Sequence, residues 1–159
     1  MLSGKIALVT NVNHYVGVAT ALMLQQYNAT VRCHDMSFSD PEKLTEFKIK
    51  HPSLTPVTQD ATCYAIDEVV DDLGKIDIVV INDFYPAIKA AIDDATVQQF
   101  KTTLDLLLVV PFTTVSSAAR HMKKNKEGKI VFVTSAAPFR GLKNYSMYVA
   151  ARGGCNSLA

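Results

Sequence analysis

Short apolar runs alternate with longer segments of helical spacing along the whole chain. The apolar runs are 5–10, 30–34, 54–57, 76–81 and 129–134. Helices are expected between them at 16–27, 62–73 and 96–124, and from the Ser39-Asp40-Pro41 turn. Continuous apolar strands that alternate with helices are typical of a parallel sheet covered on both faces. The sequence therefore predicts an α/β fold: a doubly wound, Rossmann-like parallel sheet with helices on both faces.

The pattern is consistent with one domain over residues 1–159. The chain has 48% hydrophobic and 19% charged residues, without an internal repeat or a low-complexity linker. A chain of this length can bury about two thirds of its unfolded surface, which is enough for one core. Pro111 lies inside the helix expected at 96–124, where a kink is predicted.

Composition argues against several kinds of partner. The net charge is +1, and the short basic run at 123–126 is followed by Glu127, so we expect a solvated helix end and no nucleic-acid partner. No run approaches eighteen consecutive apolar residues, so no membrane span is expected. Three cysteines and four scattered histidines lack metal-ligand spacing. We therefore expect reduced thiols, no bound metal and a cytoplasmic protein.

Polar turns follow four of the five expected strands. They are 10–17, 34–35, 82–86 and 135–138. The carboxyl ends of parallel strands meet at one edge of the sheet, where doubly wound folds bind ligands. These turns are therefore predicted to face one crevice. Ser135 lies in the last turn, Tyr148 follows thirteen positions later, and Arg152 follows Tyr148 by four.

This order of strand, turn, serine, tyrosine and basic residue resembles the short-chain dehydrogenase/reductase superfamily. Its members read T-G-x-x-x-G-x-G in the first turn and Y-x-x-x-K after the serine. Here Asn11 and Tyr15 replace two of the glycines, Gly17 remains, and Arg152 replaces the lysine. The glycines let the backbone approach a pyrophosphate, and a tyrosine side chain occupies that volume. Dinucleotide binding is therefore not expected, and no cofactor is predicted.

The combination is similar to the halohydrin dehalogenases, a cofactor-free branch of that superfamily. Further likeness comes from the stretches at 10–15 and 33–38 and from Asn82-Asp83. The resemblance implies conversion of vicinal haloalcohols to epoxides and halide, with ring opening by halide, azide or cyanide in reverse. It also implies a homotetramer or homodimer. Family members have roughly 250 residues, so we expect the C-terminal strands and part of the halide pocket to be missing from this chain.

The three matched residues have distinct expected roles. An ordinary phenol has a pKa of about 10, and a nearby permanent cation favours its ionised form. Four residues apart on one helix, Tyr148 and Arg152 share a face, so Tyr148 is the expected base and Arg152 the cation. Ser135 would hold the substrate oxygen. Asp83 either orients Arg152 or caps the following segment.

The expected pocket walls come from the same turns. Tyr15 either lines a halide site or staples the helix from the core, and amides at 15–17 could donate to the halide. Asp35 is interpreted as a structural or capping acid, since the glycines that accompany a ribose-binding acid are absent. The predicted halide and substrate pocket residues are Tyr15, Phe84, Tyr85, Pro86, Ala137, Pro138 and Leu142.

Two other functions remain open at this stage. One is an NAD(P)-dependent short-chain carbonyl reductase or alcohol dehydrogenase with an unusual first turn. The other is a catalytically silent scaffold that keeps the fold. The loss of glycines argues against the first, and the presence of Ser135, Tyr148 and Arg152 argues against the second.

Overall fold

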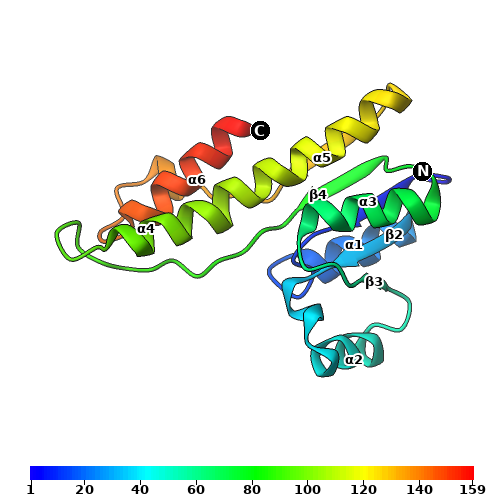
Figure 1. The fold of residues 1–159 in the computed structure, drawn as a ribbon, viewed down its shortest axis with the longest axis horizontal. Helices are drawn as coiled ribbons and strands as arrows, with labels where there is room; N and C mark the ends of the chain where they lie inside the picture. The colour runs from blue at the N-terminus through cyan, green and yellow to red at the C-terminus, as the bar shows by residue number, and fades with distance from the viewer.

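The computed structural model describes residues 1–159 and contains a five-stranded, fully parallel sheet in the order β3-β2-β1-β4-β5 (Figure 1). The strands are β1 (Ile6–Val9), β2 (Thr30–His34), β3 (Thr55–Val57), β4 (Ile78–Ile81) and β5 (Lys129–Phe132). Each lies within a predicted apolar run. The predicted Rossmann-like α/β class is confirmed.

Six α-helices connect and follow the strands. They are α1 (Gly17–Gln26), α2 (Pro41–Lys50), α3 (Thr62–Leu73), α4 (Val97–Leu104), α5 (Val110–Asn125) and α6 (Ser146–Leu158). Three short helical segments accompany them: η1 (Met36–Ser39), η2 (Asp105–Val109) and η3 (Ala137–Phe139). Local chemistry explains two of the helix starts. Asp40 accepts a hydrogen bond from the Glu42 amide before α2, and Thr96 with Gln99 forms a capping box before α4.

The helix expected at 96–124 is continuous but changes its winding before Pro111. The five residues of η2 form a π-helical segment between α4 and α5. Proline has no N–H to donate, and its ring crowds the carbonyl four residues earlier. A wider π turn is a common way to accommodate such a disturbance inside a helix. The sequence located the disturbance correctly but predicted a kink where the structure has a π segment.

This 29-residue stretch, Val97–Asn125, is long and apolar enough to cross a membrane by length and composition alone. Polar residues interrupt this stretch, so it contains no long run of consecutive apolar residues. About a third of its most apolar window is buried inside the structure. Core helices of soluble proteins meet the same criterion, and α5 packs against α3.

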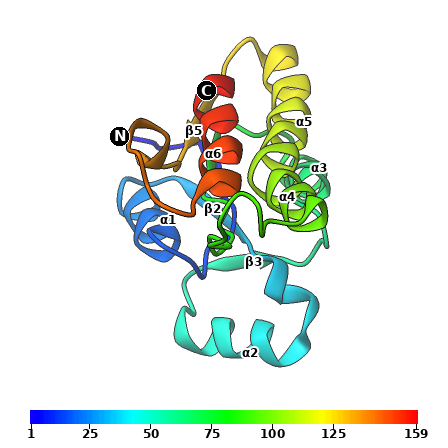
Figure 2. The same cartoon turned by 90° about the vertical axis from the view of Figure 1, so that its left-hand side faces the viewer.

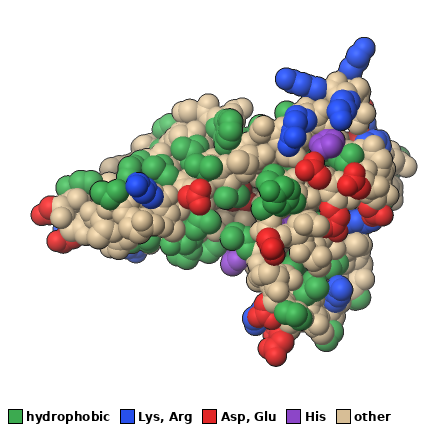
Figure 3. All heavy atoms as spheres, viewed as in Figure 1, with side chains coloured by type: hydrophobic (Ala, Val, Ile, Leu, Met, Phe, Trp, Pro, Cys, Tyr) green, Lys and Arg blue, Asp and Glu red, His purple; other side chains and the backbone are tan.

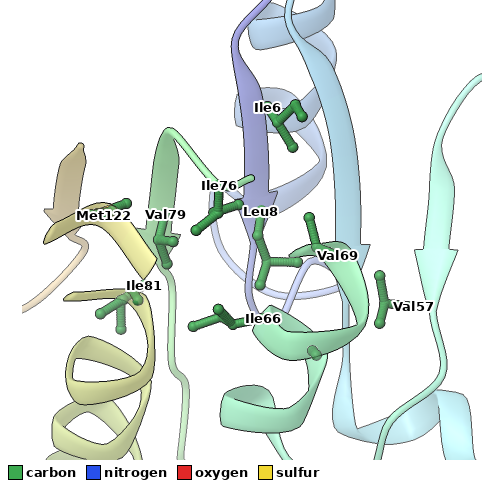
Figure 4. Close-up of a cluster of buried hydrophobic side chains, with 11 residues drawn as sticks. Ile6, Leu8, Val57, Ile66, Val69, Ile76, Val79, Ile81 and Met122 are labelled. Carbon is green, nitrogen blue, oxygen red and sulfur yellow. The ribbon is translucent and has the colours of Figure 1, made fainter. Parts of the chain in front are cut away.

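Hydrophobic clusters cover both faces of the sheet. Ile6 and Leu8 of β1 point to the face covered by α3 and α5, where they join Ile66 and Ile81 (Figure 4). The alternate residues of β1 point to the other cluster, which α1 supplies with Ala21 and Val18. This alternation is the period of two expected for a strand. It makes β1 the central, fully buried strand.

The site region projects from the sheet. Figures 1 and 2 show α4 and the start of α6 side by side, extending beyond the strands with the 82–96 segment. Figure 3 shows charged side chains gathered over the opposite end, around α2, α3 and the end of α5. The extension shows mainly hydrophobic and uncharged groups in that view. Its surface chemistry therefore differs from that of the sheet end.

Candidate active site

A buried polar network joins the carboxyl ends of β1 and β4. The Thr10 hydroxyl donates to Asp83 Oδ1 at 2.8 Å, and Asn11 Nδ2 donates to the same oxygen at 2.7 Å. The Asn82 side-chain amide donates to the carbonyl oxygens of Asn11 and His14. Buried polar groups are costly unless they are bonded in this way. The network therefore fixes the first turn against the end of β4.

Arg152 reaches this network from α6. Its guanidinium is buried, with 5% of the residue exposed, and Nη2 donates to the backbone carbonyl oxygen of Asp83 at 2.8 Å. No carboxylate lies within ion-pair distance of Arg152. Asp83 thus positions Arg152 through its main chain. The Asp83 side chain caps no helix, so the capping interpretation was wrong.

Burial dominates the electrostatics of Asp83. It raises the pKa of this carboxyl above its ordinary value, although hydrogen bonds from Thr10 and Asn11 and the Arg152 charge act in the opposite direction. Asp83 Oδ2 and Arg152 Nε have no hydrogen-bond partner in the protein. The protein therefore satisfies only one of the two Asp83 carboxylate oxygens with hydrogen bonds. Burial destabilises the ionised form of this side chain.

Ser135 and Tyr148 line one cavity of about 480 Å³. The Ser135 hydroxyl oxygen accepts a hydrogen bond from the Ala137 amide at 3.1 Å, which anchors the side chain at the end of β5. Tyr148 lies on the first turns of α6, and the Arg152 guanidinium carbon is 5.6 Å from its ring centroid. Arg152 is not part of the cavity wall. Of the three predicted catalytic residues, Ser135 and Tyr148 thus face the cavity, and Arg152 lies behind the wall beside the Tyr148 ring.

Most of the predicted wall residues surround the same cavity. The full lining is Tyr15, Phe84, Tyr85, Pro86, Ala87, Ser135, Ala136, Ala137, Arg140, Leu142, Tyr145 and Tyr148. Pro138 is absent from the wall, because its ring lies toward α6 at Gly153. Sequence reasoning missed Ala87, Ala136, Arg140 and Tyr145. Ala87 and Ala136 adjoin predicted wall residues in the chain, and that adjacency was the available signal for these two.

Tyr15 lies at the mouth of this cavity and not in the core. It is 78% exposed, and its ring centroid is 5.7 Å from that of Phe84, which also stacks on His14. The core interpretation of Tyr15 was therefore wrong. Tyr15 and Asn11 have φ values of +50° and +43°. The two residues that replace glycines keep a left-handed backbone, a conformation that costs a non-glycine residue about 1–3 kcal/mol.

The remaining glycine of this turn has a packing role. A Cβ on Gly17 would lie 2.4 Å from the carbonyl oxygen of Val12. The Gly17 amide donates to the His14 carbonyl at 2.9 Å, so it is not free for a halide as we had expected. The amides of Tyr15 and Val16 have no acceptor within the protein. These two amides remain the candidate hydrogen-bond donors to a halide from this turn.

Asp35 has the structural role that the sequence suggested. Its carboxylate accepts hydrogen bonds from the Asn13 amide at 2.9 Å and from the Ser37 amide and hydroxyl. These bonds cap η1 and tie it to the first turn. The prediction of a capping acid is confirmed.

Five parallel strands with a polar crevice at the carboxyl ends of β1, β4 and β5 define a Rossmann-like α/β domain. The chain belongs to the short chain dehydrogenase family, whose model matches residues 5–159.

Curated relatives of this chain include dehydrogenases and reductases. The chain is 28% identical over 164 residues to 2-dehydro-3-deoxy-D-gluconate 5-dehydrogenase from Formosa agariphila, covering 99% of this chain and 62% of that protein. It is 26% identical to 3-oxoacyl-[acyl-carrier-protein] reductase from Thermotoga maritima, covering 96% of this chain and 64% of the reductase. The chain therefore spans less than two thirds of these relatives.

Two of the similar solved structures are described as dehalogenating enzymes. A halohydrin dehalogenase bound to ethyl (2S)-oxiran-2-ylacetate is 37% identical, with a TM-score of 0.93 over 98% of this chain and 62% of its own. A structure described as a dehalogenation enzyme is 36% identical, with a TM-score of 0.90 over 99% of this chain and 65% of its own. An NAD⁺-bound xylitol dehydrogenase is 28% identical, with a TM-score of 0.85 over 99% of this chain and 63% of its own.

Proposed function

We propose that the protein converts vicinal haloalcohols to epoxides and halide without a nicotinamide cofactor. The observation that carries this proposal is the first turn, where the Tyr15 ring packs at a tilt against Phe84 at the cavity that also contains Ser135 and Tyr148. An aromatic side chain stands where the superfamily pattern has a glycine for the pyrophosphate. The similarity of this chain to two dehalogenating enzymes of known structure supports the same proposal.

The reaction requires one proton transfer and one displacement. The Tyr148 phenolate removes the hydroxyl proton of the substrate, while the Ser135 hydroxyl donates a hydrogen bond to the same oxygen. The alkoxide then attacks the neighbouring carbon, and the carbon–halogen bond breaks with its electron pair leaving as halide. Arg152 contributes a permanent positive charge beside the Tyr148 ring, with its guanidinium carbon 5.6 Å from the ring centroid. The products are an epoxide, a halide ion and a protonated tyrosine.

An NAD(P)-dependent carbonyl reductase is the second candidate. The curated dehydrogenase and reductase relatives favour it, because they match nearly all of this chain. The same serine and tyrosine would then hold a carbonyl oxygen for reduction. Two features disfavour this alternative: Arg152 stands where the superfamily pattern has a lysine, and Tyr15 stands where it has a glycine.

Self-association is also proposed. Large apolar side chains are exposed along the projecting helices, with Val97 at 68%, Phe112 at 55% and Phe100 at 38% exposure. Clustered apolar surface of this kind marks association sites. A homodimer or homotetramer would cover it, and sedimentation of the purified protein would reveal a single monomeric species if this expectation is wrong.

The decisive test is halide release from a small chlorohydrin with no nucleotide added. We expect chloride release by the wild type and a loss of about a hundred- to ten-thousandfold in Tyr148→Phe, which keeps the packed ring. An epoxide with azide should yield the azidoalcohol faster with protein than without. NAD(P)H oxidation with a carbonyl substrate, in the absence of any chloride release, would favour the reductase instead.

A further inference from the structure

We propose that the cavity selects haloalcohols and epoxides that carry a carboxylate, and that Arg140 is the residue that binds this group. The inference rests on the proposed function for the reaction, and on the cavity wall for the substrate class. Arg140 is the only wall residue with a formal charge at neutral pH. The other eleven are aromatic, aliphatic or hydroxyl-bearing.

The Arg140 guanidinium is not used by the protein. No carboxylate lies within 4.0 Å of it, and it makes no side-chain hydrogen bond. Asp93 and Asp94, on the segment before α4, form no ion pair with it. An arginine without a partner presents a planar fork of donors that matches a carboxylate. Its placement on a substrate cavity is therefore informative.

The backbone holds Arg140 in place. Its amide donates to the Ala137 carbonyl at 3.0 Å, and its carbonyl accepts from the Leu142 amide at 2.9 Å. Arg140 therefore directly follows η3, on the same short loop as the Ser135 anchor. A substrate whose hydroxyl contacts Ser135 and Tyr148 shares its cavity with this cation. These bonds fix the Arg140 backbone, and its side chain extends from this position along the cavity wall.

The surroundings reinforce the positive charge. The Lys89 ammonium is 5.2 Å from the ring centroid of Tyr145, another wall residue. Lys89 forms no ion pair. Two unpaired cations, Arg140 and Lys89, therefore lie near one cavity and attract anions. The volume of about 480 Å³ leaves room for a carboxylate arm beyond the reacting carbons.

A matched substrate pair isolates the carboxylate. 4-Chloro-3-hydroxybutanoate and its ethyl ester close to the corresponding oxiranylacetates with loss of chloride, and they differ only in the charged group. For the free acid, we expect Arg140→Gln to lower kcat/KM for chloride release about tenfold, in line with loss of a bidentate, charge-assisted hydrogen bond from an exposed arginine. For the ester, kcat/KM should change less than threefold.

Lys143→Gln is the control variant, because Lys143 lies on the same loop but outside the cavity wall. It should leave the acid-to-ester ratio within twofold of wild type. Arg140→Lys should retain part of the acid preference, since it keeps a charge without the fork. Equal losses for acid and ester in Arg140→Gln would overturn the inference. The inference would also be overturned if Arg140→Gln changed only the KM for azide in the ring opening of a neutral epoxide.

Binding of unreactive analogues separates this inference from the proposed function. Calorimetry should show that 3-hydroxybutanoate binds about tenfold more weakly to Arg140→Gln than to wild type, while its ethyl ester binds both alike. If neither chlorohydrin releases chloride, the proposed function fails, and the calorimetry still decides the role of Arg140. Unchanged binding of the acid in Arg140→Gln would rule out a carboxylate site there.

Discussion

Arg152 is held by the main chain of Asp83 and not by its carboxylate. The guanidinium donates from Nη2 to the Asp83 carbonyl oxygen at 2.8 Å, while its central carbon lies 5.6 Å from the ring centroid of Tyr148. Replacing the Asp83 side chain therefore leaves the bond to Arg152 available. Replacing Arg152 removes the cation from the tyrosine and leaves a buried carbonyl without its donor.

Arg152→Gln should lower halide release about a hundredfold or more, because it removes the positive charge beside the Tyr148 ring. Arg152→Lys should retain more activity with an altered pH profile, because a lysine offers a point charge that can itself titrate. Neither variant should acquire nicotinamide dependence, since Tyr15 still occupies the first turn. Halide release against pH measures this. A glutamine variant with wild-type rate and profile would remove Arg152 from the mechanism.

Neither NAD nor NADP at millimolar concentration should raise the melting temperature. A ligand present at a hundred times its dissociation constant adds about 2.7 kcal/mol to the free energy of unfolding, which a thermal melt resolves readily. Tyr15 in the first turn, packed against Phe84 after β4, is the reason for expecting no such gain. An upward shift with either nucleotide would support the reductase instead.

Asp83→Asn should make the protein at least as stable as wild type at neutral pH. Burial raises the pKa of Asp83, so its protonated form stabilises the fold below the unfolded value of about 3.9. That contribution is lost as the pH rises through the higher folded value. An amide can accept the same bonds from Thr10 and Asn11. The difference in melting temperature, variant minus wild type, should therefore grow from pH 4 to pH 7.

Asp77→Asn is the control of opposite sign. Although burial opposes ionisation, the Ile6 amide at 2.8 Å and the Lys75 ammonium at 2.9 Å lower the pKa of Asp77. Its ionised form therefore stabilises the fold above the unfolded value of about 3.9 and loses this effect as the pH falls through the lower folded value. Asp77→Asn should lower the melting temperature at pH 7. Parallel pH trends in the two variants would contradict both assignments.

Gly17→Ala should destabilise the protein by about 1–3 kcal/mol, the range typical of overpacking. The added Cβ would lie 2.4 Å from a backbone oxygen of Val12, which cannot move without distorting the first turn. Gly141→Ala is the matched control, because a Cβ there meets nothing within 4 Å. Urea unfolding of the two variants gives the comparison. Equal midpoints would show that the first turn yields to the extra atom.

The alternation of apolar runs was sufficient to predict the sheet and the order of its helices. Strands buried on both faces leave a continuous apolar signal, and the expected 62–73 helix agrees with α3. The π segment before Pro111 could not be predicted, because its register depends on how α5 packs against α3 and how η2 packs against α6. Strand order was likewise not predicted, because it depends on pairing between strands that are far apart in the sequence.

The cavity was predictable where residues directly follow a strand. Ser135 and Phe84 were found in this way, because strand ends determine where such turns lie. Arg140 and Tyr145 were missed because the loop between η3 and α6 folds back through backbone hydrogen bonds that have no sequence period. The use of the Asp83 carbonyl by Arg152 was also invisible, since every residue has a carbonyl.

The left-handed backbone at Asn11 and Tyr15 makes exchange at these positions asymmetric. Glycine could enter either position without any backbone rearrangement, because it adopts these angles freely. A larger residue entering in place of glycine must bear the strain from the outset. With the backbone unchanged, an evolutionary or engineered change from this aromatic turn to a glycine-containing, dinucleotide-accepting turn is therefore easier than the reverse change.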